Sequence, residues 1–374
     1  MPRRTIHTLI YWFCAIVFAS ILLAGCSTPA IARQGTTPDS VIAGMMAQVQ
    51  SSILIDRVKQ LSGNTPAQIG GESYTITTRE TESGVPIAKA TQFAYEFLAA
   101  RGLAVSYHNW SECDIANRNV VGEKIGVERP GEIVLVTAHL DSTSEGGVAP
   151  GADDDASGSV AVLTLAEILA PYQFQRTLRF VLFTGEEQGL CGSEVYARQA
   201  AGANVNIVAV YNMDMIAWDS DSEPIVRLHT RTTNHPGYAA DLAIANTFIS
   251  VVEQYGLGEA LTPIVAPDAV DQSDTFSFWD NGYAGILAIE DDDDVTGDFN
   301  PYYHSTADRV SALNPTYFAN FVKAGVGTAA LLAGLVQTSA GTPTATPTQA
   351  PTPTATPTAK FTPKARVFIP AVNR

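Results

Sequence analysis

The sequence predicts an α/β fold, a three-layer sandwich in which helices flank a mostly parallel central sheet. The chain has 374 residues, of which 46% are hydrophobic and 16% charged. This is a globular composition, and it excludes a wholly disordered chain or a coiled coil. Short apolar runs rich in β-branched residues alternate along the chain with segments of helical periodicity. That alternation is typical of parallel sheets, whose ligands gather at the carboxyl ends of the strands.

The expected elements follow from these two patterns in chain order. The short β-branched runs predict strands at residues 119–125, 133–138, 178–183, 206–212, 225–228 and 284–289. Apolar residues spaced three and four apart predict helices at residues 41–61, 87–101, 158–169, 193–200, 238–255 and 315–335. The length allows one large domain or two ordinary ones, and no internal repeat interrupts this order.

The first 25 residues are expected to be a signal peptide. Arg3 and Arg4 precede an apolar run that is short for a membrane-spanning helix. The run ends at residues 23–26 (LAGC), a pattern typical of lipoprotein processing, so we expect Cys26 to carry lipid. Ordinary signal cleavage or an uncleaved anchor are the alternatives. Each of them predicts export, either to the cell surface or to the medium.

Composition also divides the rest of the chain. We expect a tether at residues 26–39, the globular domain at 40–338, and a Thr/Pro-rich linker at 339–359 that cannot bury apolar surface. Residues 360–374 form a basic peptide with a small apolar core, which is either a surface-retention signal or a frayed end.

Net charge and cysteine content limit the partners. The formal charge of −16 at pH 7 argues against nucleic acid binding. Of the four cysteines, Cys14 lies in the apolar run and Cys26 would carry lipid. Cys113 and Cys191 remain, either as a disulfide or as two buried thiols.

Polar motifs follow the strand that is predicted at residues 133–138. His139 follows the strand at 133–138, with Asp141 two residues later, and a loop with three adjacent acids, Asp153 to Asp155, leads into the next helix. Adjacent carboxylates repel one another, and a multivalent cation relieves that repulsion, although an acidic helix N-terminus is the plainer explanation.

Further metal-binding residue types follow other strands. Glu186 and Glu187 come after residues 178–183, Asp214 comes after 206–212, and His304 lies downstream of 284–289. Together with His139 and the acidic loop, these groups could hold two divalent ions that share a bridging carboxylate, an arrangement that hydrolases use to activate water. Mixed His and carboxylate ligands favour zinc.

The motifs resemble those of a known family. HLD, APGADDDASG, FTGEEQG, NMDM, SDTFSFWDNGYAGI and HSTADR occur in the order and spacing of the secreted bacterial dizinc aminopeptidases, the leucyl aminopeptidase and aminopeptidase S type of metallopeptidase family twenty-eight. The resemblance covers roughly residues 40–338. It implies a zinc exopeptidase with a phosphorylase/hydrolase-like sandwich and two Zn²⁺ per chain.

The resemblance also implies the metal ligands, residue by residue. His139 and Asp214 would hold one zinc, Glu187 and His304 would hold the other, and Asp154 would bridge them. The family further implies a cis peptide bond between Asp154 and Asp155.

The same resemblance implies catalytic roles. Glu186 would be the general base and Asp141 would orient the His139 ring. Tyr303 matches a position where some members place a Tyr that stabilises the oxyanion. Asp308 would brace His304 or cap the next helix, and the capping role is the preferred interpretation.

Other conspicuous residues are interpreted as background. His108, His229 and His235 match no metal position of the family. Four consecutive Asp at residues 291–294 could hold a structural Ca²⁺ or attract a cationic peptide, although a solvated acidic loop is the preferred interpretation. Met215 is expected to line a side-chain pocket.

These features favour a metallo-aminopeptidase acting on peptides with a free N-terminus. A carboxypeptidase, an aminoacylase or a one-zinc glutaminyl cyclase on the same scaffold are alternatives, as is a non-catalytic surface ectodomain. The ectodomain is disfavoured because all six ligand and base positions are filled.

Overall fold

The computed structural model describes residues 39–293 and 297–336. The expected signal peptide, linker and C-terminal peptide therefore lie outside the described residues, as does the tether except for Asp39. Within the described residues, eight strands form the main sheet in the order β3-β4-β6-β5-β7-β10-β8-β9, and β1 and β2 form a separate antiparallel pair. The strands are β1 (Ala67–Ile69), β2 (Glu72–Tyr74), β3 (Ala104–Glu112), β4 (Ile115–Lys124), β5 (Arg129–His139), β6 (Arg176–Phe183), β7 (Ile207–Met213), β8 (Ile225–His229), β9 (Thr262–Ala266) and β10 (Gly285–Ile289).

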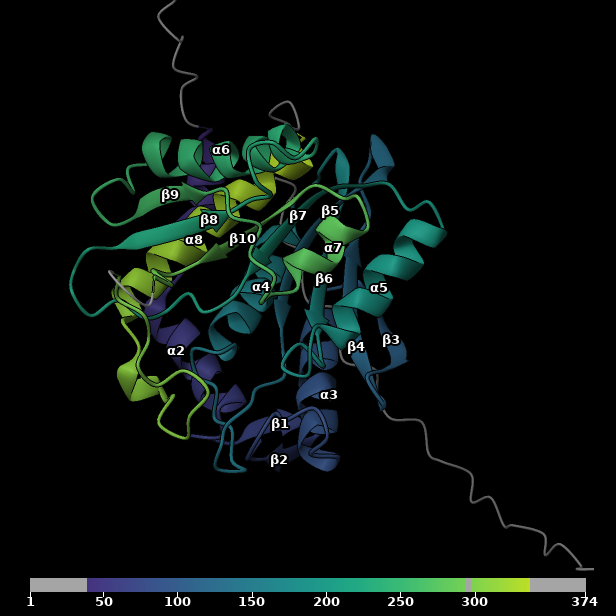
Figure 1. The fold of residues 1–374 in the computed structure, drawn as a ribbon, viewed down its shortest axis with the longest axis vertical. Helices are drawn as coiled ribbons and strands as arrows, with labels where there is room; N and C mark the ends of the chain where they lie inside the picture. Colours follow the sequence, from purple (N-terminus) through teal and green to yellow (C-terminus); the bar gives the residue numbers. More distant parts are fainter. Residues whose placement is uncertain (1–38, 294–296, 337–374) are drawn as a thin grey trace, which may run out of the picture. The chain divides into compact units, whose positions relative to one another are not determined.

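The helices cover both faces of this sheet. They are α1 (Ser40–Met46), α2 (Ser51–Leu61), α3 (Val85–Ala99), α4 (Ala156–Leu169), α5 (Cys191–Gly202), α6 (Tyr238–Gln254), α7 (Thr275–Asp280), α8 (Pro315–Ala333) and the short 3₁₀ helix η1 (Val310–Ala312). α5 and α7 contact each other on the face seen in front in Figure 1, and α3, α4, α6 and α8 contact the other face. None of the helices in the described ranges is both long and apolar enough to cross a bilayer. The predicted α/β sandwich is confirmed.

The alternation of side chains along the central strands builds the two sides of the core. In β5, Val134, Val136 and Ala138 belong to the large cluster beneath α4 and α8, whereas Ile133 and Leu135 belong to a second cluster with α5 and α7. This is the two-residue period of a strand buried on both faces, which explains why β5 appears in the sequence as a continuous apolar run.

The sheet is parallel at its centre and mixed at its edges. β6, β5, β7 and β10 run parallel to one another, whereas β4 pairs antiparallel with β6 and β8 pairs antiparallel with β10. All six predicted strands are confirmed as strands of this sheet, with small shifts at their ends. The sequence patterns did not predict β3, whose side chains are mostly half exposed, or the short β9, which contains a proline.

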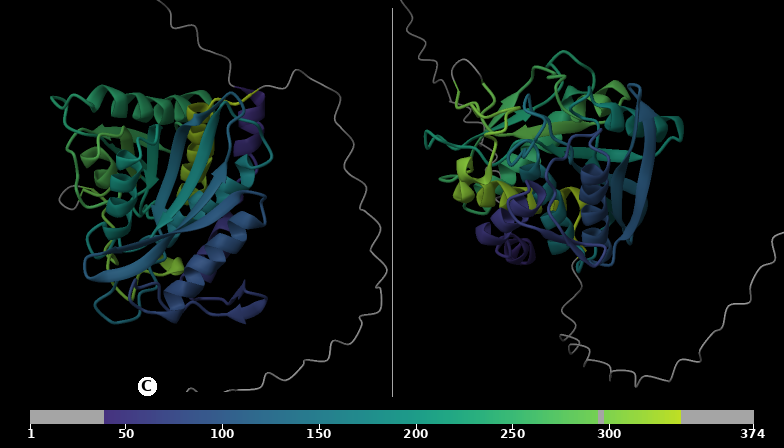
Figure 2. Two further views of the ribbon diagram at one scale, coloured as in Figure 1. Left: turned by 90° about the vertical axis from the view of Figure 1, so that its right-hand side faces the viewer. Right: turned by 90° about the horizontal axis from the view of Figure 1, so that it is seen from below.

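The prediction of one helix at 41–61 is wrong. The chain forms α1 and α2 with a break at residues 47–50, where Gln48 and Val49 donate backbone hydrogen bonds to residues three positions earlier. The break lets α1 pack against α8 and α2 pack against α4 as well as α8, and Val49 within the break is buried. Figure 2 shows α1, in purple, beside the yellow α8.

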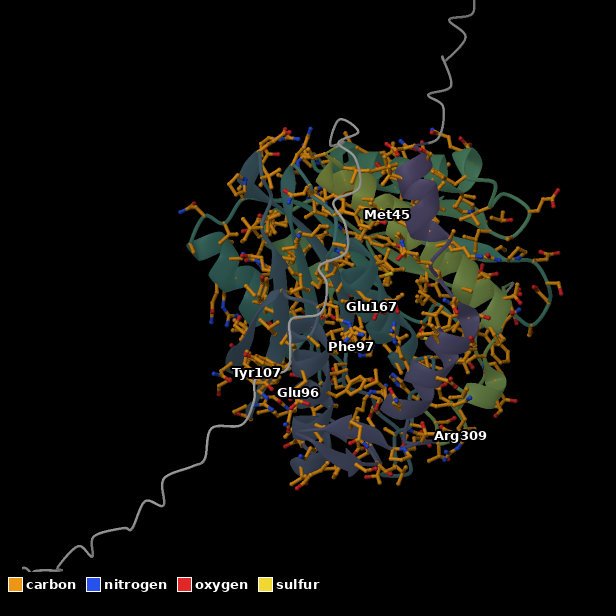
Figure 3. All side chains as sticks on the ribbon, turned by 180° about the vertical axis from the view of Figure 1, so that it is seen from behind. Met45, Glu96, Phe97, Tyr107, Glu167 and Arg309 are labelled. Carbon is orange, nitrogen blue, oxygen red and sulfur yellow. A yellow bond between two sulfur atoms is a disulfide. The ribbon has the colours of Figure 1, made fainter. Side chains whose placement is uncertain are left out.

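Ion pairs attach the N-terminal helices to the domain. Glu167 of α4 accepts hydrogen bonds from Arg57 of α2 and from Arg101, which follows α3, and both guanidinium groups lie over the Phe97 ring. Figure 3 shows Phe97 and Glu167 close together in the view from behind.

A disulfide connects the edge of the sheet to a helix. It joins Cys113, in the turn between β3 and β4, to Cys191 at the start of α5.

Candidate metal centre and active site

The parallel centre of the sheet brings the predicted site residues together at the carboxyl ends of its strands. β6, β5, β7 and β10 are consecutive neighbours and run in the same direction, so the segments that follow them meet. His139 ends β5, Glu186 and Glu187 follow β6, and Asp214 follows β7. His304 arrives from the long loop after β10.

Asp154 lies between two imidazole rings. One carboxylate oxygen lies 3.1 Å from His139 Nε2 and the other lies 3.2 Å from His304 Nε2. His139 Nε2 is also 3.3 Å from Asp214, and His304 Nε2 is 3.0 Å from Glu187. The structure therefore gathers all five predicted ligands into two groups that share Asp154.

The donor set fits divalent metal ions. Potential ligand atoms of His139, Glu186 and Asp214 lie within 4.8 Å of one another, and so do those of His139, Asp154 and Glu187. The carboxylates are buried, and buried carboxylates without countercharge are unfavourable. Imidazole and carboxylate together are the ligand types that zinc prefers.

The pKa shifts indicate that this cluster attracts positive charge. Burial lowers the pKa of His304, but hydrogen bonds with Asp154 and Glu187 raise it more, to about 10. Burial and the neighbouring Asp154 raise the pKa of Glu187 to about 7. A divalent cation would supply the required charge without protonating the ligands.

The loop that carries Asp154 is held by two neighbouring carboxylates. Asp155 caps α4 by accepting from Gly158 N, and it also accepts from His139 N. Asp308 accepts from the backbone N–H groups of Asp153 and Asp154, so the predictions that it caps the following helix or braces His304 are wrong. The Asp154–Asp155 peptide bond is cis, which confirms the expectation from the resemblance.

Asp141 lies behind His139 but makes its hydrogen bonds elsewhere. Its carboxylate is 3.7 Å from His139 Nδ1, longer than a hydrogen bond. It accepts from the Thr81 hydroxyl at 2.8 Å and from the backbone N–H groups of Glu186 and Glu187 at 3.4 and 3.3 Å. Asp141 therefore connects the end of β5 to the turn that carries both glutamates.

Glu186 and Tyr303 face the same cavity as the ligand cluster. Burial raises the pKa of Glu186 well above its usual value, and the nearby carboxylates of Asp214 and Asp274 act in the same direction. The Tyr303 ring stacks on the His304 imidazole with 3.7 Å between ring centroids. Burial and the site carboxylates raise the pKa of Tyr303, so its hydroxyl remains a hydrogen-bond donor at neutral pH.

The cavity beside the cluster has a volume of about 420 Å³. Its apolar lining consists mainly of Met215, Val270, Leu287, Ile289 and Phe299. The prediction that Met215 lines a side-chain pocket is confirmed. Met215 and His304 both have left-handed backbone conformations, with φ of 49° and 52°, and such conformations are commonly found at functional sites.

Sequence reasoning missed three residues that support the site. Ser273, the first residue of the SDTFSFWDNGYAGI motif and without an assigned role, donates to the Asp214 carboxylate at 2.7 Å. Thr81 binds Asp141, and the fully buried Arg79 donates to four carbonyl oxygens, including those of Leu140 and Gly151 next to the ligand loops. No local pattern marks Thr81 or Arg79, because both lie more than fifty positions before the first ligand.

The residues interpreted as background have structural partners. His108 lies 3.1 Å from Gln199, and His235 accepts from Gly237 N within its own turn. His229 pairs with Asp268 and Asp292.

In the acidic run at residues 291–294, the three aspartates that the structure describes form ion pairs. Asp291 and Asp293 pair with Arg227, and Asp292 pairs with His229. The interpretation as a solvated loop is wrong for Asp291, which is buried, whereas Asp292 and Asp293 are half-buried. Because Arg227 and His229 already supply countercharge, the alternative of a structural Ca²⁺ has no support. Asp294 lies outside the described residues.

Comparison with known proteins supports the family resemblance. Residues 119–328, more than half of the chain, match the model of peptidase family M28. A "probable zinc metalloprotease" of Pyrenophora teres f. teres is 40% identical over 114 residues, which are 28% of this chain and 24% of that protein. A "probable leucine aminopeptidase 2" of Aspergillus oryzae is 26% identical over 314 residues, 77% of this chain and 59% of that protein.

The fold is also shared with a solved structure. The LapA aminopeptidase of Legionella pneumophila superposes with a TM-score of 0.63 at 20% identity, over 80% of this chain and 76% of LapA. The chain spans between 24% and 59% of the length of the first three curated relatives. With the match over residues 119–328 and the gathered ligand set, the chain belongs to peptidase family M28.

Proposed function

We propose that the protein is a dizinc aminopeptidase that removes the N-terminal residue from peptides. The observation that carries the proposal is the position of Asp154, with one carboxylate oxygen facing each of two imidazoles, in a cavity that also contains Glu186. Zinc is the metal that the ligand types favour, and the Pyrenophora relative is named a zinc metalloprotease.

Each ligand has an assigned place in this proposal. His139 and Asp214 would hold one zinc ion, Glu187 and His304 would hold the second, and Asp154 would bind both. Bound zinc would polarise the scissile carbonyl and lower the pKa of a water molecule.

The side chains of the pocket perform the proton transfers. Glu186 accepts a proton from the attacking water as the water oxygen bonds to the carbonyl carbon, and it returns that proton to the nitrogen of the leaving amine as the C–N bond breaks. The raised pKa of Glu186 suits a group that must both take and give a proton near neutral pH. Tyr303 would donate a hydrogen bond to the developing oxyanion.

The pocket supports exopeptidase action. The free amine of a substrate would meet the carboxylates of the cluster, while its side chain would lie against the apolar residues around Met215 and Leu287. An acylated N-terminus would lack the positive charge that these carboxylates favour.

The test compares leucine p-nitroanilide with its N-acetylated form, each with and without a zinc chelator. We expect cleavage of the free amine only, abolished by the chelator and restored by added zinc. Equal cleavage of the acetylated compound would favour an aminoacylase. No cleavage of either by folded, zinc-loaded protein would favour a carboxypeptidase or a glutaminyl cyclase.

We also propose that the enzyme acts outside the cytoplasm, tethered through lipid on Cys26. The pattern at residues 23–26 and the disulfide between Cys113 and Cys191 support export, because disulfides persist in oxidising compartments. Replacing Cys26 by Ala should move the protein from the membrane fraction to the medium. An unchanged distribution would contradict the tether.

A further inference from the structure

Among the described residues, the cavity beside the ligand cluster contains one ionisable side chain that the proposed mechanism does not use. Among the described residues that line it, the ionisable ones are the candidate ligands and catalytic groups, together with Asp292. Asp292 shares the cavity with apolar residues such as Met215, Leu287 and Phe299. A carboxylate in a largely apolar pocket needs a specific partner.

The cations that pair with Asp292 are not part of the cavity lining. One Asp292 oxygen lies 3.1 Å from His229 Nε2 and the other lies 3.4 Å from Arg227 Nε. Neither His229 nor Arg227 is among the described residues that line the cavity. A carboxylate has about four acceptor positions, so these two contacts leave Asp292 able to accept from a group inside the cavity.

The charge around Asp292 remains negative after this pairing. Arg227 and His229 provide two cations, whereas four carboxylates contact them: Asp268, Asp291, Asp292 and Asp293. The pKa of His229 is consistent with this excess. Burial lowers it, but hydrogen bonds with Asp268 and Asp292 raise it more, to about 9.

We infer that Asp292 makes the cavity select N-terminal residues with an apolar stem and a cationic end, namely lysine and arginine. This inference rests on the proposed aminopeptidase function and names its substrate class. The methylene groups of such a side chain would lie against Met215, Leu287 and Phe299, and its terminal cation would donate to the Asp292 carboxylate. Hydrogen bonds between charged partners are about twice as strong as neutral ones.

The inference is tested with lysine p-nitroanilide and norleucine p-nitroanilide, because norleucine has the lysine side chain without its terminal amine. At pH 7.5 we expect kcat/KM for the lysine substrate to exceed that for norleucine by about 10-fold or more, the range of a charge-assisted hydrogen bond. Asp292→Asn should remove this preference and leave kcat/KM for norleucine within about 3-fold of its original value.

Asp293→Asn is the matched control. Asp293 pairs with the same Arg227 but is not among the described residues that line the cavity. This variant should therefore retain the preference for lysine. A general effect of removing one acidic charge would change both variants alike.

Two results would overturn the inference. The first is a wild-type enzyme that cleaves the norleucine substrate as well as the lysine substrate, a comparison that does not depend on any variant folding. The second is a loss of kcat/KM in Asp292→Asn that is equal for both substrates. If folded, zinc-loaded protein cleaves neither of these compounds nor leucine p-nitroanilide, the proposed function itself is wrong.

Discussion

Thr81 connects two of the segments that form the candidate metal centre. Its hydroxyl donates to the Asp141 carboxylate at 2.8 Å and accepts from Gly185 N at 3.1 Å, just before Glu186 and Glu187. Thr81 is buried, so removing the hydroxyl would leave both partners without this hydrogen bond. Groups of this kind orient the ligands of metal sites without touching the metal.

We expect Thr81→Val to lower zinc affinity or kcat by about 10-fold to 100-fold, the usual effect of losing a group that supports metal ligands. Thr81→Ser, which keeps the hydroxyl, should restore most of the loss. Thr177→Val is a matched control, because the buried Thr177 hydroxyl also donates one hydrogen bond and accepts another, but at the opposite end of β6. A loss of thermal stability alone, shared by Thr81→Val and Thr177→Val, would assign Thr81 a purely structural role.

At the residue scale, the sequence predicted the site residues that lie in recognisable motifs. It did not predict the residues that support them through tertiary contacts. His139 and Glu187 follow the ends of predicted strands, and Asp154 precedes a predicted helix, so their convergence could be predicted. Thr81 and Ser273 contact the site only through tertiary packing, and neither is a residue type that typically binds zinc.

At the scale of elements, α8 depends on a close approach between helices. A Cβ atom at Gly327 would lie 2.7 Å from a methyl carbon of Val251 in α6 and 3.2 Å from the sulfur of Met46 in α1. Gly44 is an exposed position in α1, and a Cβ atom there would have no heavy atom of another described segment within 4 Å.

Gly327→Ala should therefore destabilise the protein by about 1 to 3 kcal/mol, because overpacking outweighs the higher helix propensity of alanine. Gly44→Ala should stabilise it by about 0.5 to 1 kcal/mol, since only propensity changes there. Urea unfolding of both variants checks this pair. Equal effects at the two positions would contradict the proposed packing of α8 against α1 and α6.

The elements that the sequence predicted are those whose burial produces a clear period. β5 and β6 are buried on both faces and appear as apolar runs, whereas β3, at the edge of the sheet, has few buried side chains. The break between α1 and α2 has neither proline nor glycine, and it follows from the separate packing of the two helices. Edge strands and interhelical breaks depend on tertiary contacts that no local pattern contains.

At the scale of the whole molecule, the His229 pairing makes stability depend on pH. The folded pKa of about 9 lies above the unfolded value of about 6.5. The charged imidazole therefore contributes its full stabilisation below pH 6.5, and this contribution is lost as the pH rises through 9.

We expect the difference in unfolding free energy between the wild type and His229→Gln to fall by about 3 kcal/mol from pH 6 to pH 10, since each pKa unit corresponds to about 1.4 kcal/mol. Chemical unfolding of zinc-loaded protein at a series of pH values measures this difference. A difference that does not vary with pH would mean that folding leaves the pKa of His229 unchanged, so that pairing its charge does not stabilise the fold.

The architecture of the whole domain was predictable because alternating strands and helices allow few topologies. The order of the central strands then brings the motifs together, so the location of the site followed from the fold class. The pairing of Asp291, Asp292 and Asp293 with Arg227 and His229 was not predictable, because these partners lie on β8, more than sixty residues earlier.

The most direct test of the proposed mechanism is the turnover of leucine p-nitroanilide by Glu186→Gln, measured together with its metal content. We expect two zinc ions per chain, as in the wild type, and a loss of kcat of about 100-fold to 10,000-fold, because the amide keeps the shape of the side chain but cannot accept the proton. Retained turnover with both metals bound would contradict the role of Glu186 as general base, and loss of a metal would place Glu186 among the ligands.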